Sequence, residues 1–262
     1  MRKPAVRLRI RDLPGGPVAW VSIDNQSKLN VLGGGLARRL SAALDQLEAS
    51  RSIRALVLRG EGSRAFIGGA DLREMAELDA ASARAFILDL HGVCRRLRDF
   101  PVPTLARIEG YCLGAGMEVA ASCDLRAAST DSQFGMPEVR VGVPSVIEAA
   151  LLPQLVGWGR TRELLLTGDI VNAQAALDMG FIQRLVPAAD LDDAIEGWLE
   201  SILSAGPVAV RDQKELFRLW ERASLPRAIR EGVRFFARAY RTDEPKRMMR
   251  AFLDGRSSQR RD

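Results

Sequence analysis

Two short glycine-rich stretches are the part of this sequence best suited to chemistry. The first is residues 67–71, Ile-Gly-Gly-Ala-Asp, and the second is residues 113–118, Leu-Gly-Ala-Gly-Met-Glu. Each places small residues where a strand should turn into a helix, so that a backbone N–H can point at a ligand oxygen. The candidate donors are the N–H groups of Ala70 and Ala115. Two such donors form an oxyanion hole, in which each preorganised donor contributes about 10²–10³ in rate.

Two glutamates supply a candidate acid/base pair for the same site. Glu118 belongs to the first turn of the helix expected after Gly114, and Glu138 follows Pro137 in a loop. A carboxylate in the first turn also stabilises the helix dipole, so Glu118 has a structural role as well as a candidate catalytic one. Two close carboxylates titrate as a coupled pair, and one of them keeps a proton more readily than an isolated glutamate. The combination predicts an enzyme that forms an enolate.

The histidine and cysteine content disfavours other common kinds of active site. His91 is the single histidine, and it falls in the helical run 81–97, where we expect a partly exposed side chain without a catalytic role. With one histidine, a Ser-His-Asp triad or a multi-histidine metal site is hard to build. Cys94, Cys112 and Cys123 lie in apolar periodic segments without metal-ligand spacing. This pattern predicts that the three cysteines are small buried residues in a reducing compartment and that the chain has no metal site.

The charge and hydropathy of the chain limit its partners. The formal net charge is +5, but only four of the 38 basic residues are lysines, and the arginines are scattered along the chain. This pattern indicates a solvated basic surface, with a positive field that helps to capture a polyanion such as coenzyme A; Lys28 is either a phosphate contact or an exposed loop lysine. No signal-like segment and no run of about 20 apolar residues occurs, so we expect a cytoplasmic protein without membrane contact.

The periodicity of the first two thirds predicts alternating strands and helices. Strands are expected at residues 17–23, 53–58, 102–108 and 125–128. Helices are expected at residues 33–47, 81–97 and 114–121, and the first of them places Leu36, Leu40, Leu44 and Leu47 on one stripe. The sequence from Asp71 to Glu74 has the spacing of a capping box at a helix start. This alternation indicates an α/β fold in which helices cover the sheets.

The last quarter of the chain changes to an all-helical pattern. Helical periods cover residues 190–205, 208–222, 226–241 and 245–254. We therefore expect two domains, a core at 1–188 and a helical subdomain at 189–262. The apolar faces of these helices pack either on the core or on a neighbouring subunit. Residues 255–262 are polar and are expected to fray.

Four segments together carry a resemblance to a known family: residues 25–32, 66–74, 110–124 and 134–142. In order and spacing they resemble the crotonase, or enoyl-CoA hydratase/isomerase, superfamily, and the similarity extends over the whole chain. The resemblance implies an α/β crotonase-like spiral of repeated ββα units with a C-terminal helical trimerisation subdomain. It also implies a homotrimer or a dimer of trimers, an acyl-CoA thioester as substrate, and no cofactor beyond the coenzyme A within that substrate.

The resemblance also implies roles for the chemical residues. Ala70 and Ala115 match the oxyanion donors, and Glu118 and Glu138 match the glutamates that together hold water. In relatives, the residue matching Glu138 chiefly protonates the α-carbon while water adds to the β-carbon. Further positions match substrate or CoA contacts: Lys28, Gly68, Gly69, Asp71, Leu72, Gly114 and Phe252. For Asp71 a helix cap, and for Phe252 core packing, are the competing structural roles.

Two departures from the family pattern concern the substrate. Typical hydratases have a glycine-rich turn where this chain has residues 144–148, Pro-Ser-Val-Ile-Glu. Ser145 and Glu148 have the spacing of a capping box. Alternatively, Glu148 is a third carboxylate of the site, or Val146 and Ile147 form a wall that reshapes the acyl pocket.

The second departure lies near the end of the chain. The lysine expected three positions after Phe252 is Gly255, and Arg256 is the candidate substitute.

These observations favour one function over three others. The retained glutamate pair favours reversible hydration of an enoyl-CoA to a 3-hydroxyacyl-CoA. An enoyl-CoA isomerase and a specialised dehydratase of a branched or substituted acyl-CoA are alternatives within the enzyme class. A non-catalytic protein that binds acyl-CoA or RNA is a third, disfavoured because the glutamate pair is present and no RNA-recognition motif is.

Overall fold

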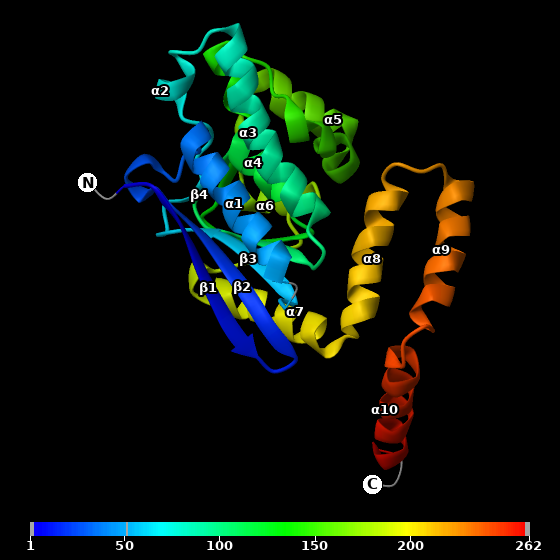
Figure 1. The fold of residues 1–262 in the computed structure, drawn as a ribbon. Helices are drawn as coiled ribbons and strands as arrows, with labels where there is room; N and C mark the ends of the chain where they lie inside the picture. The colour runs from blue at the N-terminus through cyan, green and yellow to red at the C-terminus, as the bar shows by residue number, and fades with distance from the viewer. Residues whose placement is uncertain (1–2, 51, 260–262) are drawn as a thin grey trace.

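The main sheet forms the centre of the molecule. The computed structural model describes residues 3–50 and 52–259, which form two β-sheets, the helices that cover them, and a helical arm (Figure 1). The six-stranded sheet has the order β1-β2-β3-β5-β7-β10, with β1 antiparallel to β2 and the other neighbours parallel. Its strands are β1 (Ala5–Leu13), β2 (Gly16–Asp24), β3 (Ala55–Gly60), β5 (Thr104–Ile108), β7 (Leu125–Ser129) and β10 (Arg184–Val186).

A second, smaller sheet positions the glycine-rich stretches. Its order is β4-β6-β8-β9, and β4, β6 and β8 run parallel while β9 is antiparallel to β8. The strands are β4 (Ala65–Ile67), β6 (Tyr111–Leu113), β8 (Gln133–Gly135) and β9 (Ile170–Asn172). The carboxyl ends of parallel strands meet at one edge of a sheet. The segments after β4, β6 and β8 therefore converge, and they carry Ala70, Ala115 and Glu138.

Helices on one face of the main sheet complete the larger core. They are α1 (Gly34–Ser50), α2 (Leu72–Met75), α3 (Ala80–Asp99), α4 (Ala115–Ala121), α5 (Leu152–Thr167) and α6 (Ala173–Asp178). Four 3₁₀ helices join them: η1 (Gln26–Lys28), η2 (Pro137–Val141), η3 (Ile147–Leu151) and η4 (Ala188–Asp190). The leucines at 36, 40, 44 and 47 of α1 are all buried. Full burial of such a side chain stabilises the fold by about 1.5–3 kcal/mol.

The opposite face of the main sheet is covered by α7 (Leu191–Ser204). Val18, Trp20 and Val57 point to this face and pack with Ile195 and Leu199 of α7. Their neighbours along the strands pack in the larger core, as the two-residue period of a strand requires. The sheet is thus apolar on both sides.

Three more helices form an arm that leaves the core. They are α8 (Pro207–Trp220), α9 (Leu225–Ala239) and α10 (Glu244–Gln259), and α10 lies at the far end (Figure 1). The buried Lys214 Nζ of α8 lies 2.7 and 2.8 Å from the carboxylate oxygens of Asp124. Asp124 also accepts hydrogen bonds from the N–H and hydroxyl of Thr104. This network attaches α8 to the start of β5. The division of the chain at residue 188 stays a prediction.

Most expected elements are present, whereas the strands β8, β9 and β10 and the helix α6 were not among those expected. Strand β1 was not predicted: it is an edge strand whose alternating basic side chains largely face solvent. The expected fraying from Gly255 is wrong as far as Gln259, because α10 continues through these residues. No helix-breaking proline follows Gly255 in that stretch. Residues 260–262 lie outside the described residues. Among those described, no helix combines the length and apolar content needed to cross a bilayer.

Candidate active site

The two predicted oxyanion donors lie at the edge where β4 and β6 end. Ala115 is the first residue of α4, so no carbonyl within the helix accepts from its N–H. Ala70 forms a bridge with Leu32, in which Leu32 N donates to Gly69 O and Asp71 N donates to Leu32 O. This bridge uses the groups on either side of Ala70. Among the described residues, neither Ala70 N–H nor Ala115 N–H donates a hydrogen bond, so both are available to a ligand.

Two glycines allow the strands, the helix and Glu138 to approach closely. Gly114 adopts φ +51° and ψ −118°, and a Cβ there would lie 2.3 Å from Glu138 Oε1. A Cβ at Gly116 would lie 2.2 Å from the carbonyl oxygen of Ile67. Larger residues at either position would separate α4 from β4 or displace Glu138.

A single cavity of about 440 Å³ contains both donors and both glutamates. Ala70, Ala115, Glu118 and Glu138 line it. Its walls are otherwise mainly apolar, with contributions from Met75, Leu78, Phe86, Ile87, Leu90, Val143, Pro144 and Val146. An apolar pocket with a few convergent polar groups is the usual form of a small-molecule site. Val146 is a wall of this cavity, as one interpretation of the sequence expected, whereas Ile147 packs against the core.

The two glutamates have different surroundings. Glu118 is 5% exposed, and its Oε1 accepts a hydrogen bond of 3.2 Å from Ala149 N–H. Burial, followed by the nearby charges of Glu138 and Glu148, raises the pKa of Glu118 to about 8. Glu138 Oε2 accepts a hydrogen bond of 2.8 Å from the Ser145 hydroxyl. At neutral pH the buried member of the pair therefore carries a proton.

Burial of Glu118 should make the stability of the protein depend on pH. Its pKa is about 8 in the folded chain against 4.5 for an ordinary glutamate, so the folded state binds more protons between these values. This stabilising contribution is complete below pH 4.5 and is lost as pH rises to 8. We expect the unfolding free energy of the wild type, minus that of Glu118→Gln, to fall by roughly 3–5 kcal/mol over this range. Urea unfolding of both proteins at several pH values measures the difference; parallel curves would contradict the assigned pKa.

The turn that departs from the family pattern contacts both glutamates. The expected capping box of Ser145 and Glu148 is wrong, because no side chain caps η3 and the Ser145 hydroxyl donates to Glu138 instead. The buried Glu148 carboxylate lies 3.0 and 3.2 Å from His91 Nδ1. His91 is partly exposed on α3, as expected, but its contact with Glu148 was not predicted. No sequence signal links two positions that far apart.

The predicted CoA-binding positions fall into two groups. Lys28 Nζ lies 3.0 Å from Asp71 Oδ2, and Asp71 also caps α2 by accepting from Arg73 N–H. The predicted capping box is only half formed, because Glu74 accepts from Gly34 N–H instead. Gly68, Gly69, Leu72 and Gly114 lie in the same segments as the donors.

Phe252 is not brought to this site within one chain. It is 59% exposed and belongs to α10, at the far end of the arm from α2 and α4 (Figure 1).

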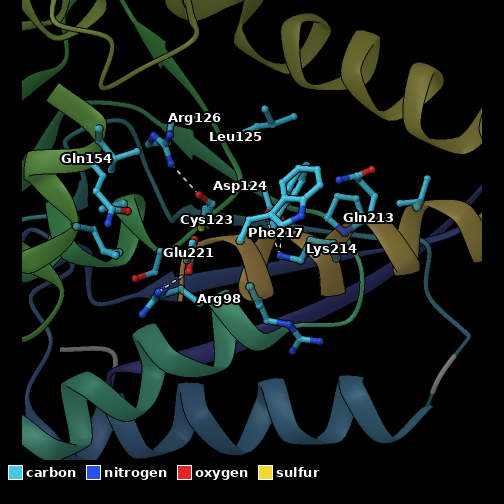
Figure 2. A pocket seen from close by; sticks show the side chains of 18 of the residues that line it. Arg98, Cys123, Asp124, Leu125, Arg126, Gln154, Gln213, Lys214, Phe217 and Glu221 are labelled. Carbon is cyan, nitrogen blue, oxygen red and sulfur yellow. Dashed lines mark hydrogen bonds and ion pairs between the residues drawn. The ribbon is translucent and has the colours of Figure 1, made fainter. Parts of the chain in front are cut away.

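A larger cavity of about 640 Å³ lies between the core and α8 (Figure 2). It contains none of the predicted site residues. Four of the charged side chains that line it form two ion pairs, Lys214 with Asp124 and Arg98 with Glu221. The smaller cavity with the two free N–H groups is therefore the candidate active site.

Solved structures share this fold. The chain aligns with an enoyl-CoA hydratase from Bacillus anthracis with a TM-score of 0.90 and 27% identity, covering 95% of this chain and 96% of that one. It aligns with an enoyl-CoA hydratase from Mycobacterium smegmatis with a TM-score of 0.91 and 28% identity, covering 97% of each. The two-sheet core with its helical arm is the crotonase fold, which confirms the expected fold class.

The sequence comparisons identify the family. The pattern of the enoyl-CoA hydratase/isomerase family matches residues 15–261. The chain is 31% identical to the short-chain-enoyl-CoA hydratase of Clostridium acetobutylicum, over 92% of this chain and 93% of that protein. It is 30% identical to the crotonyl-CoA hydratase of Syntrophomonas wolfei, with the same coverage. The chain belongs to the enoyl-CoA hydratase/isomerase family.

Proposed function

We propose that the protein is a hydro-lyase that reversibly hydrates an α,β-unsaturated acyl-CoA to a 3-hydroxyacyl-CoA. The observation that carries this proposal is the arrangement of two free N–H groups and two glutamates around one apolar cavity. The relatives named as short-chain-enoyl-CoA and crotonyl-CoA hydratases support the same reaction. Coenzyme A enters as part of the substrate, and the proposal requires no other cofactor.

In hydration, the N–H donors stabilise negative charge and the glutamates transfer protons. The thioester oxygen accepts from Ala70 N–H and Ala115 N–H, which stabilise the negative charge that develops there as water adds to the β-carbon. One carboxylate accepts the proton that water loses, and the other donates a proton to the α-carbon. The glutamate pair holds one proton before the reaction and one proton after it, but the proton is then on the other glutamate. The high pKa of Glu118 supports a resting state in which the pair holds that proton.

The wall at Val146 supports a second candidate substrate. This side chain lines the cavity at the turn where typical hydratases have glycines. It narrows the space beside the acyl chain, so a branched or otherwise substituted enoyl-CoA is the alternative substrate. Isomerisation of the double bond would use the same donors, and product stereochemistry distinguishes it from hydration.

Loss of the conjugated-thioester absorbance tests the reaction directly. Purified protein mixed with crotonyl-CoA should reduce this absorbance and produce 3-hydroxybutyryl-CoA, identified by mass spectrometry. A series of longer and branched enoyl-CoA esters then measures how Val146 restricts the acyl group, with Val146→Gly as the comparison. An absence of hydration across the whole series, in a protein that still binds the thioesters, would contradict the proposal.

The arm supports assembly into a homotrimer or a dimer of trimers. Exposed apolar side chains form a stripe along α9 at helical spacing: Leu225, Ile229, Val233, Phe236 and Tyr240. An unpartnered stripe of this size favours contact with a second copy. In such an assembly, the arm of one subunit brings Phe252 to the CoA of a neighbour. Light scattering measures the stoichiometry, and fractionation of cells tests the cytoplasmic location that the sequence predicts.

A further inference from the structure

The turn formed by residues 145–149 contacts both members of the acid/base pair. At its start, the Ser145 hydroxyl donates to Glu138 Oε2 at 2.8 Å. At its end, Ala149 N–H donates to Glu118 Oε1 at 3.2 Å. A shift of this turn would therefore change the direction of both catalytic carboxylates.

The same turn contains a strained residue. Ile147 has φ +41°, in the left-handed region that β-branched residues almost never adopt. Such a conformation costs about 1–3 kcal/mol and persists only where surrounding contacts impose it. The neighbouring side chain provides such a contact: Glu148 is 3% exposed, and both its oxygens lie within 3.2 Å of His91 Nδ1.

Glu148 is buried, so its carboxylate depends on the hydrogen bond with His91. The titratable groups that interact with Glu148 are His91 and Cys94 of α3 and Glu118 of α4. Burial, with Glu148 and Glu118 nearby, raises the pKa of the Cys94 thiol well above its usual value, so this thiol is neutral. A buried carboxylate without a hydrogen-bonding partner is strongly destabilised. Among the described residues, His91 is the one side chain that hydrogen-bonds to Glu148.

Helix α3 gives His91 a fixed position. Phe86, Leu90 and Val93 of this helix are buried in the larger core. Neither His91 nor Glu148 lines the cavity that holds the two N–H donors. Their contact is therefore outside the lining of that cavity.

Building on the proposed function, we infer that His91 and Glu148 are positioning residues for the reaction. Their contact holds the 145–149 turn in its strained conformation against α3. The turn in turn directs Glu138 through the Ser145 hydroxyl and Glu118 through Ala149 N–H. A catalytic pair misplaced by about 1 Å loses roughly 10²-fold in rate, so a loosened turn lowers kcat.

Two substitutions of His91 separate positioning from packing. His91→Leu removes the donor, and we expect kcat to fall about 10- to 100-fold while KM stays within about threefold. His91→Asn keeps a donor near the place of Nδ1 and should return kcat to within about threefold of the wild type. Arg95→Leu, an exposed change on the same helix, is the matched control and should leave kcat unchanged.

The rate of hydrogen exchange at the Ala149 amide measures how firmly the turn is held, independently of enzyme activity. Exchange should be faster in His91→Leu and close to wild type in His91→Asn. Wild-type kcat and exchange in His91→Leu, or equal losses in both His91 variants, would overturn the inference. If the wild type hydrates no enoyl-CoA but exchange accelerates in His91→Leu alone, the proposed function fails and the positioning of the turn stands.

Two substitutions of Glu148 provide a second test if His91→Leu does not fold. Glu148→Gln keeps an oxygen acceptor for His91 Nδ1, whereas Glu148→Leu removes it. At the pH optimum, kcat and exchange at the Ala149 amide should stay within about threefold of the wild type in Glu148→Gln. In Glu148→Leu we expect faster exchange and a kcat about 10- to 100-fold lower. Equal effects in the two variants would overturn the inference.

Discussion

Glu118→Gln and Glu138→Gln should each reduce the rate of crotonyl-CoA hydration by about 10²–10⁴. Glutamine has nearly the same size as glutamate but cannot carry a proton between water and the α-carbon. Glu118→Gln keeps an oxygen for Ala149 N–H, and Glu138→Gln keeps one for the Ser145 hydroxyl. The loss should therefore appear in kcat, with binding of the acyl-CoA largely retained. Initial rates and direct binding of a saturated acyl-CoA measure the two effects.

The control for these variants is a glutamate away from the cavity. Glu163→Gln removes an exposed carboxylate that pairs with Arg160 on α5, and it should leave the rate within about twofold, since exposed ion pairs contribute little. The double variant Glu118→Gln/Glu138→Gln should have a rate only slightly below that of the less active single variant, because the two glutamates act as a unit. Near-wild-type turnover in either single variant would remove that residue from the acid/base pair.

Exchange of the α-hydrogen of butyryl-CoA with deuterium oxide assigns the roles within the pair. This saturated thioester can lose and regain an α-proton but cannot add water. The glutamate that serves the α-carbon is the one whose substitution abolishes exchange. The family resemblance implies that this is Glu138, whereas burial gives Glu118 the proton in the unliganded protein. Exchange retained in Glu138→Gln and lost in Glu118→Gln would reverse the expected roles.

The parts of the site that follow from local sequence could be predicted. Glycine stretches after short apolar strands predicted two backbone donors, because only small residues permit such close approach to a ligand. Parallel pairing of β4, β6 and β8 then brings these stretches together with Glu138. The leucine spacing of α1 likewise predicted the buried face of that helix, because residues that recur with the helical period lie on the same face.

The parts that depend on tertiary packing could not be predicted. His91 and Glu148 meet only because α3 packs against η3, and each separately has an ordinary local explanation. The hydroxyl of Ser145 was expected at a helix start, but the path of the turn brings it to Glu138. The location of Phe252 relative to a CoA molecule depends on a second chain, which no pattern within one sequence describes.

Ala115→Pro should reduce hydration by at least about 10²–10³, the contribution of one oxyanion donor. Ala115 is the first residue of α4, where proline is tolerated because the N–H has no partner in the helix. Gly114 before it has φ +51° and ψ −118°, which is outside the α region that a following proline disfavours. The substitution thus removes the N–H and places a ring carbon where the hydrogen pointed, while the helix is retained. Initial rates with crotonyl-CoA measure the loss.

Ala115→Gly is the matched variant, because it changes the same residue and keeps the N–H. Glycine in a helix costs about 1 kcal/mol of stability, so this variant should be slightly less stable but active within a few-fold of the wild type. Circular dichroism must show that Ala115→Pro keeps its helix content. A folded Ala115→Pro protein with wild-type turnover would mean that the thioester oxygen is stabilised elsewhere. A large loss in Ala115→Pro alone would instead assign the N–H of Ala115 to the transition state, since the neighbouring glutamates are the same in both variants.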